Sequence, residues 1–458
     1  MSLAALVLAA WIPISLCLYG KLGPTRGALI SLLAGWILLP NEAYPVEALE
    51  LATSQNRFVV HSLALAADPL WNKASAIGLG CLLGIVLFDA ESLRRLRFLA
   101  LDGAFLLFAA IPILSAWSNG LPIAGGLAQA RHLILAWGVP YLVGRTRFAS
   151  PEALLEMEKA WAIAGLVTAP AALLEFATGP VFYDWVYGQN PYRADGISRT
   201  LGHRPLLFME QGNQWGMWAA STALAAAWLW AGGERDLARV GQLRIPTRRA
   251  AIILVVVAIL GQSHSSLGWL ACGLAWIAAI RLRIPKRAIR AAIAAGAVLV
   301  VLAAAILVVR SGGPGALRNN VRGFFVGLGK TSFTWRLARV AEHLEAIRER
   351  PILGHGLADW SPMTPDGRFI APVSIAYPLM EAGFHGVIAA LASMAVLAAP
   401  IVLAARRLAR SGRANAAVAA AVAILAINLA DLFLNSCLLP PILVAAGGLT
   451  AWSTSEPE

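Results

Sequence analysis

Long apolar runs, separated by shorter polar segments, occupy most of the chain from its first residues to its last. A helix that crosses a bilayer needs about 20 mostly apolar residues, with about 17 as the lower end. By this criterion the sequence predicts about 13 spans (roughly 12–14) and a polytopic transmembrane helical protein of the all-α class. The predicted spans are 3–20, 26–40, 75–89, 103–118, 123–143, 158–178, 213–231, 250–265, 266–281, 291–309, 374–404, 416–433 and 436–452. We therefore expect residues 1–458 to form a single transmembrane domain.

The composition excludes the main soluble classes. Hydrophobic residues make up 59% of the chain and charged residues 14%, whereas an ordinary soluble domain carries about 25% charged residues. No soluble core could bury so many apolar side chains and leave a polar surface, which excludes a cytoplasmic globular enzyme and a disordered chain. The apolar runs are continuous rather than alternating, which argues against an outer-membrane barrel. The four cysteines lie in or beside apolar runs without CxxC spacing, and we expect them to be packing residues.

The charge distribution predicts the sidedness of the spans. The 37 Lys and Arg residues exceed the 25 Asp and Glu residues, giving a formal net charge of +12. Many of these cations lie in short loops that all fall on one face, as expected for cytoplasmic loops, so the excess needs no nucleic-acid partner. This arrangement puts the N-terminus outside and the C-terminus inside. The basic loops are 21–26, 94–97, 145–147, 235–249, 281–290 and 406–413. The opposite face carries three longer loops, 41–74, 179–212 and 310–373.

The loop at 310–373 is the largest of the three and is rich in arginine. Apolar residues recur at helical spacing within 334–350, which predicts an amphipathic helix in this loop. The positions of this stripe are Leu337, Val340, Leu344 and Ile347. The stripe is expected either to pack on the membrane domain or to lie in the membrane interface. Arg336 and Arg339 lie about one turn apart and can point at one ligand.

The strongest local signal is Arg336 followed by Pro351-Ile352-Leu353-Gly354-His355-Gly356. One interpretation is structural, a loop helix that ends in a Pro/Gly turn with His355 incidental. The functional interpretation is an arginine that neutralises a diphosphate beside a histidine placed for proton transfer. Guanidinium groups suit phosphate because their donors form a planar fork, and histidine is the usual general base near neutral pH.

Further candidates lie in the second outer loop and near the outer ends of spans. Arg199, His203 and Arg204 could face the same anion as Arg336, or could contact lipid headgroups. Arg131 could join them or extend toward the interface. Intramembrane acids are functional hypotheses by default, with pairing to a cation or a helix terminus as the alternative. The acids in or near apolar runs are Glu175, Glu210, Glu381 and Asp431.

Nucleotide and metal motifs are missing from the sequence. There is no GxxxxGK[ST], no GxGxxG after a strand and no HExxH, and the seven histidines have no metal spacing. We therefore expect no cofactor and no metal, and an ATP-driven pump within this chain is disfavoured.

Taken together, these motifs resemble the O-antigen ligase and O-antigen polymerase superfamily of bacterial envelope glycosyltransferases, over residues 100–405. The family pattern is an arginine, an amphipathic helix and then Pro-hydrophobic-hydrophobic-Gly-x-Gly, and Arg336 precedes Pro351 by the 15 residues that this pattern implies. Residues 379–386 resemble the Glu-x-Gly-x-x-Gly stretch that opens the next span, and residues 199–202 resemble an Arg-x-x-Gly segment of the earlier outer loop.

One departure from the family pattern bears on the type of enzyme. Ligases of this family carry a His-Asn, His-Ser or His-Gln pair shortly before the Glu-x-Gly-x-x-Gly stretch, and Pro372-Val373 stands at that place here. The histidine proposed as general base in the ligases is therefore missing, which leaves His355, His203 or an acid as substitutes. A polymerase or a divergent exopolysaccharide enzyme is favoured over a strict ligase.

The resemblance implies a multi-pass glycosyltransferase of the bacterial inner membrane that acts at its outer face. The donor would be a polyprenyl-diphosphate-linked glycan, attacked by a hydroxyl of a glycan or lipid acceptor in a metal-independent, inverting displacement. Membrane lipids are the other expected partner. The implied catalytic residues are His355 and Arg336, the diphosphate-binding residues Arg199, Arg204 and Arg339, and the supporting residues His203, Glu381 and Arg131.

Two other functions stay open from the sequence. A glycan-lipid or anion transporter would place its charges at the midplane of repeated halves, whereas no repeat is visible here and many cations lie in outer loops. A catalytically inactive assembly partner is the other alternative, because the family histidine is missing.

Overall fold

The computed structural model describes residues 2–41, 72–188, 198–199, 201–240, 243–261, 263–283, 285, 287, 323, 340, 344, 347–356, 376–411, 415–435 and 438–455. Helices dominate this part of the chain, which confirms the all-α class. The helices are α1 (Leu3–Leu38), α4 (Lys73–Phe88), α5 (Ala90–Arg94), α6 (Ala100–Ser118), α7 (Ile123–Leu133), the π-helix η2 (Ile134–Gly138), α8 (Val139–Arg147), α9 (Pro151–Thr178), α10 (Phe182–Tyr187), α11 (Gly212–Ala231), α12 (Thr247–Leu260), α13 (His264–Arg281), α17 (Tyr377–Ser411), α18 (Ala416–Leu432) and α19 (Ile442–Thr454). Two small antiparallel hairpins pair β1 (Ser198–Arg199) with β2 (Gly202–His203) and β3 (Asp236–Val240) with β4 (Leu243–Pro246).

Helix α1 consists of two antiparallel arms, which correspond to the first two predicted spans. Gly23 has a φ of 78° inside it, and Pro24 follows, so the helix cannot continue through this point. The hydroxyls of Ser15 and Ser31, one on each arm, lie 2.6 Å apart. The arms therefore face one another, and α4 packs against them.

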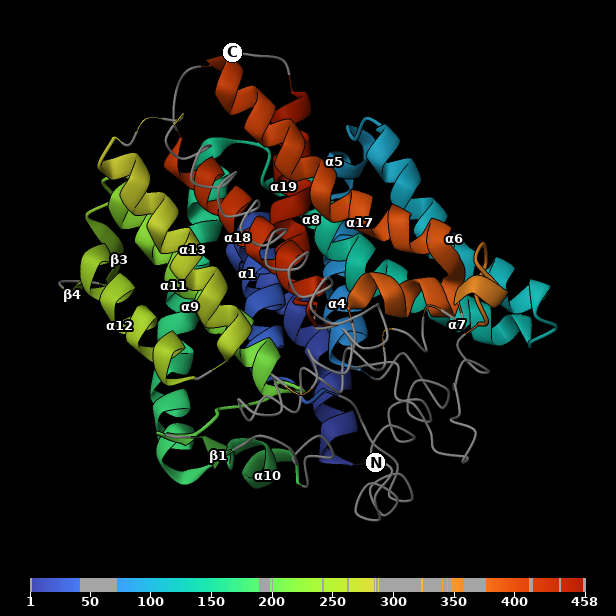
Figure 1. Cartoon of the computed structure of the whole chain (residues 1–458), viewed down its shortest axis with the longest axis horizontal. Coiled ribbons are helices and arrows are strands. Elements are labelled where there is room, and N and C mark those ends of the chain that lie inside the picture. The colour runs from blue at the N-terminus through green and yellow to red at the C-terminus, as the bar shows by residue number, and fades with distance from the viewer. Residues whose placement is uncertain are drawn as a thin grey trace.

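The bundle is arranged around these central helices (Figure 1). Figure 1 shows α11, α12 and α13 on one side and α6 and α7 on the other, with α1, α8, α18 and α19 between them. Buried Ala, Leu and Trp side chains fill the interior; those from α11 include Trp215 and Trp218, each 1% exposed or less. The end of the bundle that carries α10 and β1 lies opposite the end that carries α5 and the C-terminus.

Four helices in the described residues are long and apolar enough to cross a membrane. These are Leu3–Leu38, Ala100–Ser118, Pro151–Thr178 and Tyr377–Arg410. Each predicted span except 291–309, which lies outside the described residues, coincides with a helix or a helix arm. Several of these, such as α4, α18 and α19, are 13 to 17 residues long, below the ordinary bilayer length. The total of about 13 spans is therefore not confirmed and stays a prediction.

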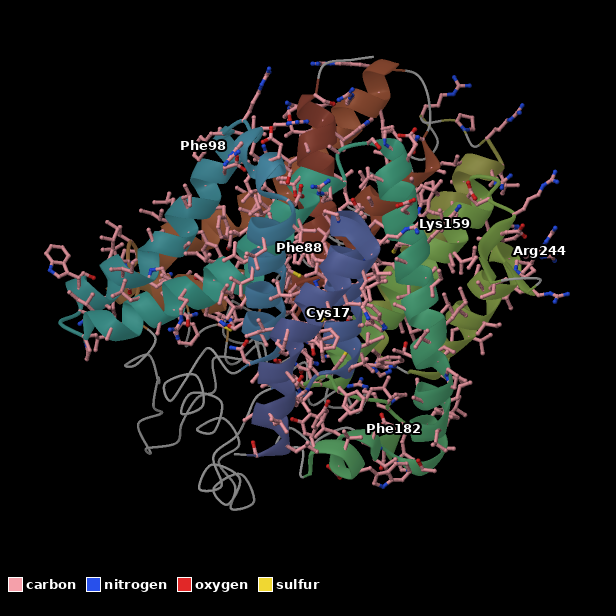
Figure 2. The ribbon with its side chains drawn as sticks, turned by 180° about the vertical axis from the view of Figure 1, so that it is seen from behind. Cys17, Phe88, Phe98, Lys159, Phe182 and Arg244 are labelled. Atoms are coloured by element: carbon pink, nitrogen blue, oxygen red, sulfur yellow. The ribbon has the colours of Figure 1, made fainter. Side chains whose placement is uncertain are left out.

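Three of the four cysteines lie in the described part of the chain, and Cys437 lies outside it. Cys81 is buried in α4, as expected for a packing residue. The expectation is wrong for Cys17 of α1 and Cys272 of α13, whose side chains are exposed; Figure 2 labels Cys17. A cysteine on an apolar helix surface needs no internal partner, because its thiol is itself weakly polar.

Candidate functional site

Helix α17 is sharply bent at its start, and the bend carries the clearest local geometry of the candidate site. Its short first arm ends at Gly386, whose φ of 87° and ψ of 171° break the helix. The turn at 351–356 is bonded to this bend by three backbone hydrogen bonds, which together form what we call the clasp. The N–H of His355 donates to the carbonyl of Gly383 at 3.0 Å, that of Gly356 to Phe384 at 2.8 Å and that of Val387 to Pro351 at 2.8 Å.

The glycines of both segments are required by this close approach. Gly354 and Gly356 have φ values of 67° and 78°, which other residues adopt at a cost. A β-carbon on Gly354 would overlap the backbone of Phe384 and His385, and one on Gly386 would overlap the carbonyl of Ile352. The two motifs that carry the family resemblance, the Pro-x-x-Gly-x-Gly turn and the Glu-x-Gly-x-x-Gly stretch, are thus one structural unit.

The end of α6 supports the clasp from a third segment. The side-chain amide of Asn119 donates to the carbonyl of Gly354 at 3.0 Å, and the Ser115 hydroxyl donates to that of Phe384 at 3.3 Å. Ile347, the last position of the predicted apolar stripe, is 8% exposed and clusters with Ala382 and Ala390 of α17. At this position the stripe packs on the membrane domain, as one of the two interpretations proposed.

Two histidines lie within this unit, and they differ in exposure. The imidazole of His355 is half-buried. His385 is 2% exposed, and its Nδ1 lies 2.6 Å from Oε1 of Glu381, which is itself 4% exposed. The Tyr377 hydroxyl donates to the other carboxylate oxygen at 3.2 Å. The sequence analysis named Glu381 but missed His385, which the i, i+4 spacing of Glu381 and His385 on one helix face could have revealed.

The second outer loop is held in place by one carboxylate. Glu175, near the end of α9, is fully buried and accepts four backbone hydrogen bonds. The donors are Val181 and Phe182 at 3.0 Å to one oxygen, and Leu206 and Leu207 at 2.8 Å to the other. Of the two interpretations of this acid, the structure therefore supports the pairing one, in which Glu175 joins α9 to the start of α10 and to the segment after β2.

The Arg-x-x-Gly segment is a tight hairpin on the same loop. Arg199 pairs with Gly202 and Ser198 with His203 across β1 and β2. Gly202 has a φ of 134°, and a β-carbon on it would lie 2.8 Å from the carbonyl oxygen of Phe176 near the end of α9. The Nδ1 atom of His203 is buried without a hydrogen-bond partner among the described residues. The aliphatic part of the Arg204 side chain packs against Gly212 at the start of α11. Arg204 thus joins α11 to the loop that Glu175 holds in place.

Lys73 is a cation of this region that the sequence analysis assigned only to a loop. It is the first residue of α4 and is 3% exposed. Its ammonium donates to the carbonyl of Phe208, lies 5.0 Å from the ring of Trp36 and interacts electrostatically with Glu210. The ammonium therefore connects α4 to the loop that carries Arg204.

Helix α7 connects the two halves of the candidate site. Nδ1 of His132 lies 3.1 Å from the side-chain amide of Asn72 and 3.2 Å from the hydroxyl of Ser75. Beyond it, the π-helix η2 carries Trp137, whose ring centroid lies 5.7 Å from that of Tyr377. Such π-helical turns occur frequently at functional sites. Arg131, beside His132, is exposed.

Aromatic residues of α10 close the loop against α1. The Tyr187 hydroxyl donates to the carbonyl of Leu38 at 2.7 Å, and its ring packs at 5.4 Å from that of Phe208. Burial raises the pKa of Tyr187 to about 12, so the phenol stays protonated and keeps this bond at neutral pH.

The predicted site residues are thus distributed over two groups. His355 lies in the clasp and Glu381 on the first arm of α17, while Arg199, His203 and Arg204 lie on the loop held by Glu175. Arg336 and Arg339 lie outside the described residues, and of Arg199 only the backbone is described. The roles assigned to all of them stay predictions.

Comparison with known families bears on the first group directly. Residues 249–385 match the family model described as O-Antigen ligase. This part of the chain is similar to the O-antigen ligase family. The predicted resemblance to the O-antigen ligase and polymerase superfamily is confirmed. The O-antigen ligase match begins in α12, runs through the turn at 351–356 and ends at His385. No curated protein matches the chain.

Proposed function

We propose that the protein is a membrane glycosyltransferase that polymerises or transfers a polyprenyl-diphosphate-linked glycan at the outer face of the bacterial inner membrane. The family match supports a membrane enzyme that transfers glycans. The finer assignment of donor, acceptor and reaction is our own. Polymerase or exopolysaccharide chemistry is favoured over strict ligase chemistry because Pro372-Val373 stands where ligases carry histidine.

The observation that carries the proposal is the clasp. The matched segment contains both the turn at 351–356 and the first arm of α17, and three backbone hydrogen bonds join them. Pro351 directly follows the loop segment that includes Arg336 and Arg339. The clasp would anchor the end of this loop segment and so restrict the positions that Arg336 and Arg339 can take. Such preorganisation is what a site needs to stabilise charge that develops on a leaving group.

In the proposed reaction the acceptor hydroxyl attacks the anomeric carbon, and the bond from that carbon to the lipid diphosphate breaks. Arg336, Arg339, Arg199 and Arg204 are proposed to bind the diphosphate, whose charge grows as it leaves. His355 is proposed to accept the hydroxyl proton, with Glu381, His203 and Arg131 in support. Between the two histidines of the clasp, His355 is the better base because its half-buried ring can meet a hydroxyl, whereas His385 is 2% exposed.

No metal or cofactor enters the proposed reaction, because the lipid diphosphate is already a good leaving group and arginines can stand in for a divalent ion. Metal independence stays a prediction.

The assignment of Arg336 is tested by replacing it with alanine in the full chain. We expect R336A to abolish glycan product in a producing cell while the amount of membrane protein is unchanged. Arg348 is the matched control, since it lies in the same loop and is exposed. R348A should keep product length and yield. Unchanged product in R336A, or an equal loss in both variants, would contradict the role of Arg336.

A further inference from the structure

A basic cavity opens at the end of the bundle opposite to α10 and the β1–β2 hairpin (Figure 1). Its volume is about 670 Å³. It lies where the segment from α5 to α6 meets the ends of α8 and α19, far from the clasp and from the loop held by Glu175. The lining includes Arg95, Arg97, Arg145 and Arg147, with the hydroxyls of Ser92 and Ser455.

Two of these arginines are fixed by the protein itself. The Arg145 guanidinium is bonded to Asp102 and donates to the carbonyl of Arg97 at 2.9 Å. Arg147 forms an ion pair with Asp89. The Nε atoms of both arginines are buried without a hydrogen-bond partner among the described residues. Because these Nε atoms are themselves buried, the cavity wall offers a ligand the positive charge of the two fixed guanidinium groups rather than these donors.

The other two arginines are exposed at the rim. Arg95 pairs with Glu91 at 3.1 Å, in a contact that leaves its side chain 77% exposed. No hydrogen bond or ion pair within the described part of the chain engages the guanidinium of Arg97. The four arginines that line the cavity face three carboxylates in or beside it, so a positive charge is left for a ligand. The carboxylates are Asp89, Glu91 and Asp102.

We propose that this cavity binds the phosphate headgroup of an anionic membrane lipid. Guanidinium forks are the groups that recognise phosphate oxygens. Basic pockets between membrane helices are a recurrent site for anionic headgroups. The proposal is independent of the glycan-transfer function, because the cavity shares no residue with that candidate site.

A lipid phosphate is favoured over a free phosphate by the apolar surface beside the cavity. At the end of α4, Leu87 is 64% exposed and Phe88 is 46% exposed, and Phe98 is 69% exposed directly after Arg97. Figure 2 shows Phe98 at this end of the molecule and Phe182 at the other. An acyl chain could cover these side chains while its phosphate lies among the arginines.

The experiment is a titration of the purified full chain in a non-ionic detergent with dioctanoyl-phosphatidylglycerol, followed by calorimetry. Parallel titrations use dioctanoyl-phosphatidylcholine, glycerol 3-phosphate and inorganic phosphate. The test variant is R95Q/R97Q, whose exposed side chains can be changed without removing the buried pairs. The matched controls are R94Q, which loses a charge in the same segment but does not line the cavity, and R244Q on distant β4 (Figure 2).

We expect saturable binding of phosphatidylglycerol, weakened at least tenfold in R95Q/R97Q and less than twofold in R94Q and R244Q. Phosphatidylcholine and the two soluble phosphates should bind at least tenfold more weakly than phosphatidylglycerol. Unchanged binding in R95Q/R97Q, or an equal loss in R94Q, would overturn the site. Binding of glycerol 3-phosphate or inorganic phosphate as tight as that of the lipid would overturn the lipid assignment.

Discussion

The carbonyl oxygen of Ile352 occupies the place where a β-carbon of residue 386 would stand, so only glycine fits at the bend of α17. Residues 357–375, which lie outside the described part of the chain, separate the two in sequence. The two residues meet because Val387 donates to the carbonyl of Pro351. The contact unites the turn that follows the arginine-rich segment with the first arm of α17. It explains why the second motif ends in glycine at position 386.

We predict that G386A destabilises the clasp. Alanine at a φ of 87° and a ψ of 171°, a conformation adopted almost only by glycine, would cost about 1–3 kcal/mol, and the overlap with Ile352 would add about 1–3 kcal/mol. The thermal unfolding midpoint of the purified protein should fall by several degrees, with loss of activity. Gly268 is the control, because a β-carbon there meets nothing and its φ is ordinary for a helix. An equal midpoint in G386A and G268A would show that the close contact is not formed.

We predict that the Glu175 carboxylate holds the second outer loop in place, because both its negative charge and its position suit the four backbone N–H groups that it accepts from. In E175Q one side-chain oxygen becomes an N–H₂ donor facing two backbone N–H groups, so two of the four bonds are lost at a cost of about 2 kcal/mol or more. Hydrogen exchange should become faster at the amides of residues 181, 182, 206 and 207. The exposed Glu152 in the first turn of the same helix is the control. Unchanged protection in E175Q, or the same change in E152Q, would contradict this role.

We predict that Glu381 and His385, which form a buried pair, are strongly coupled in their contributions to the free energy of unfolding. Removing His385 alone leaves a buried carboxylate without its partner, which costs about 3–5 kcal/mol. We expect E381Q/H385N to be destabilised by less than the sum of E381Q and H385N, as measured by a double-mutant cycle on unfolding. The exposed i, i+4 pair of Glu91 and Arg95 supplies the control cycle, with coupling within about 1 kcal/mol of zero. Additive effects at Glu381 and His385 would mean that the pair is not formed.

The role of His355 is tested by H355A, since alanine removes the ring but leaves the backbone bond to Gly383. General base catalysis contributes about 10²–10⁴-fold to rate, so the turnover of purified protein should fall by that range. Its thermal midpoint should stay within about 2 °C of the wild type, because the half-buried ring makes a small packing contribution. H264A is the control, because His264 is an exposed residue at the start of α13. Full activity in H355A would remove the histidine from the mechanism.

Local sequence patterns predict the helices well, because a long run of apolar residues indicates a buried helix without any information from distant segments. The run at 158–178 became α9, and the polar gap around Gly23-Pro24 marks the turn between the arms of α1. The run at 291–309 and the loop at 310–373 lie largely outside the described residues, so the expectations there stay predictions.

Long-range relationships were less visible from the sequence. The clasp depends on backbone contacts between segments far apart in the chain. The spacing of the glycines in each segment does not by itself indicate which segment the other one contacts. Lys73 falls within the predicted outer loop 41–74, whereas in the structure it is buried, with its ammonium against the ring of Trp36 and the carbonyl of Phe208. His385 was read as part of a glycine motif, although its spacing from Glu381 places both on one helix face.

The most direct test of the proposed function is an assay of the purified full chain in lipid, supplied with a polyprenyl-diphosphate oligosaccharide and chelator but no nucleotide. The account predicts longer glycans on the lipid carrier, which R336A does not form and R348A does. Transfer to a lipid A core acceptor instead would make the enzyme a ligase and contradict the preference for a polymerase. No glycan product with either acceptor, together with movement of the lipid across the bilayer, would contradict the central claim of glycan transfer and favour a transporter.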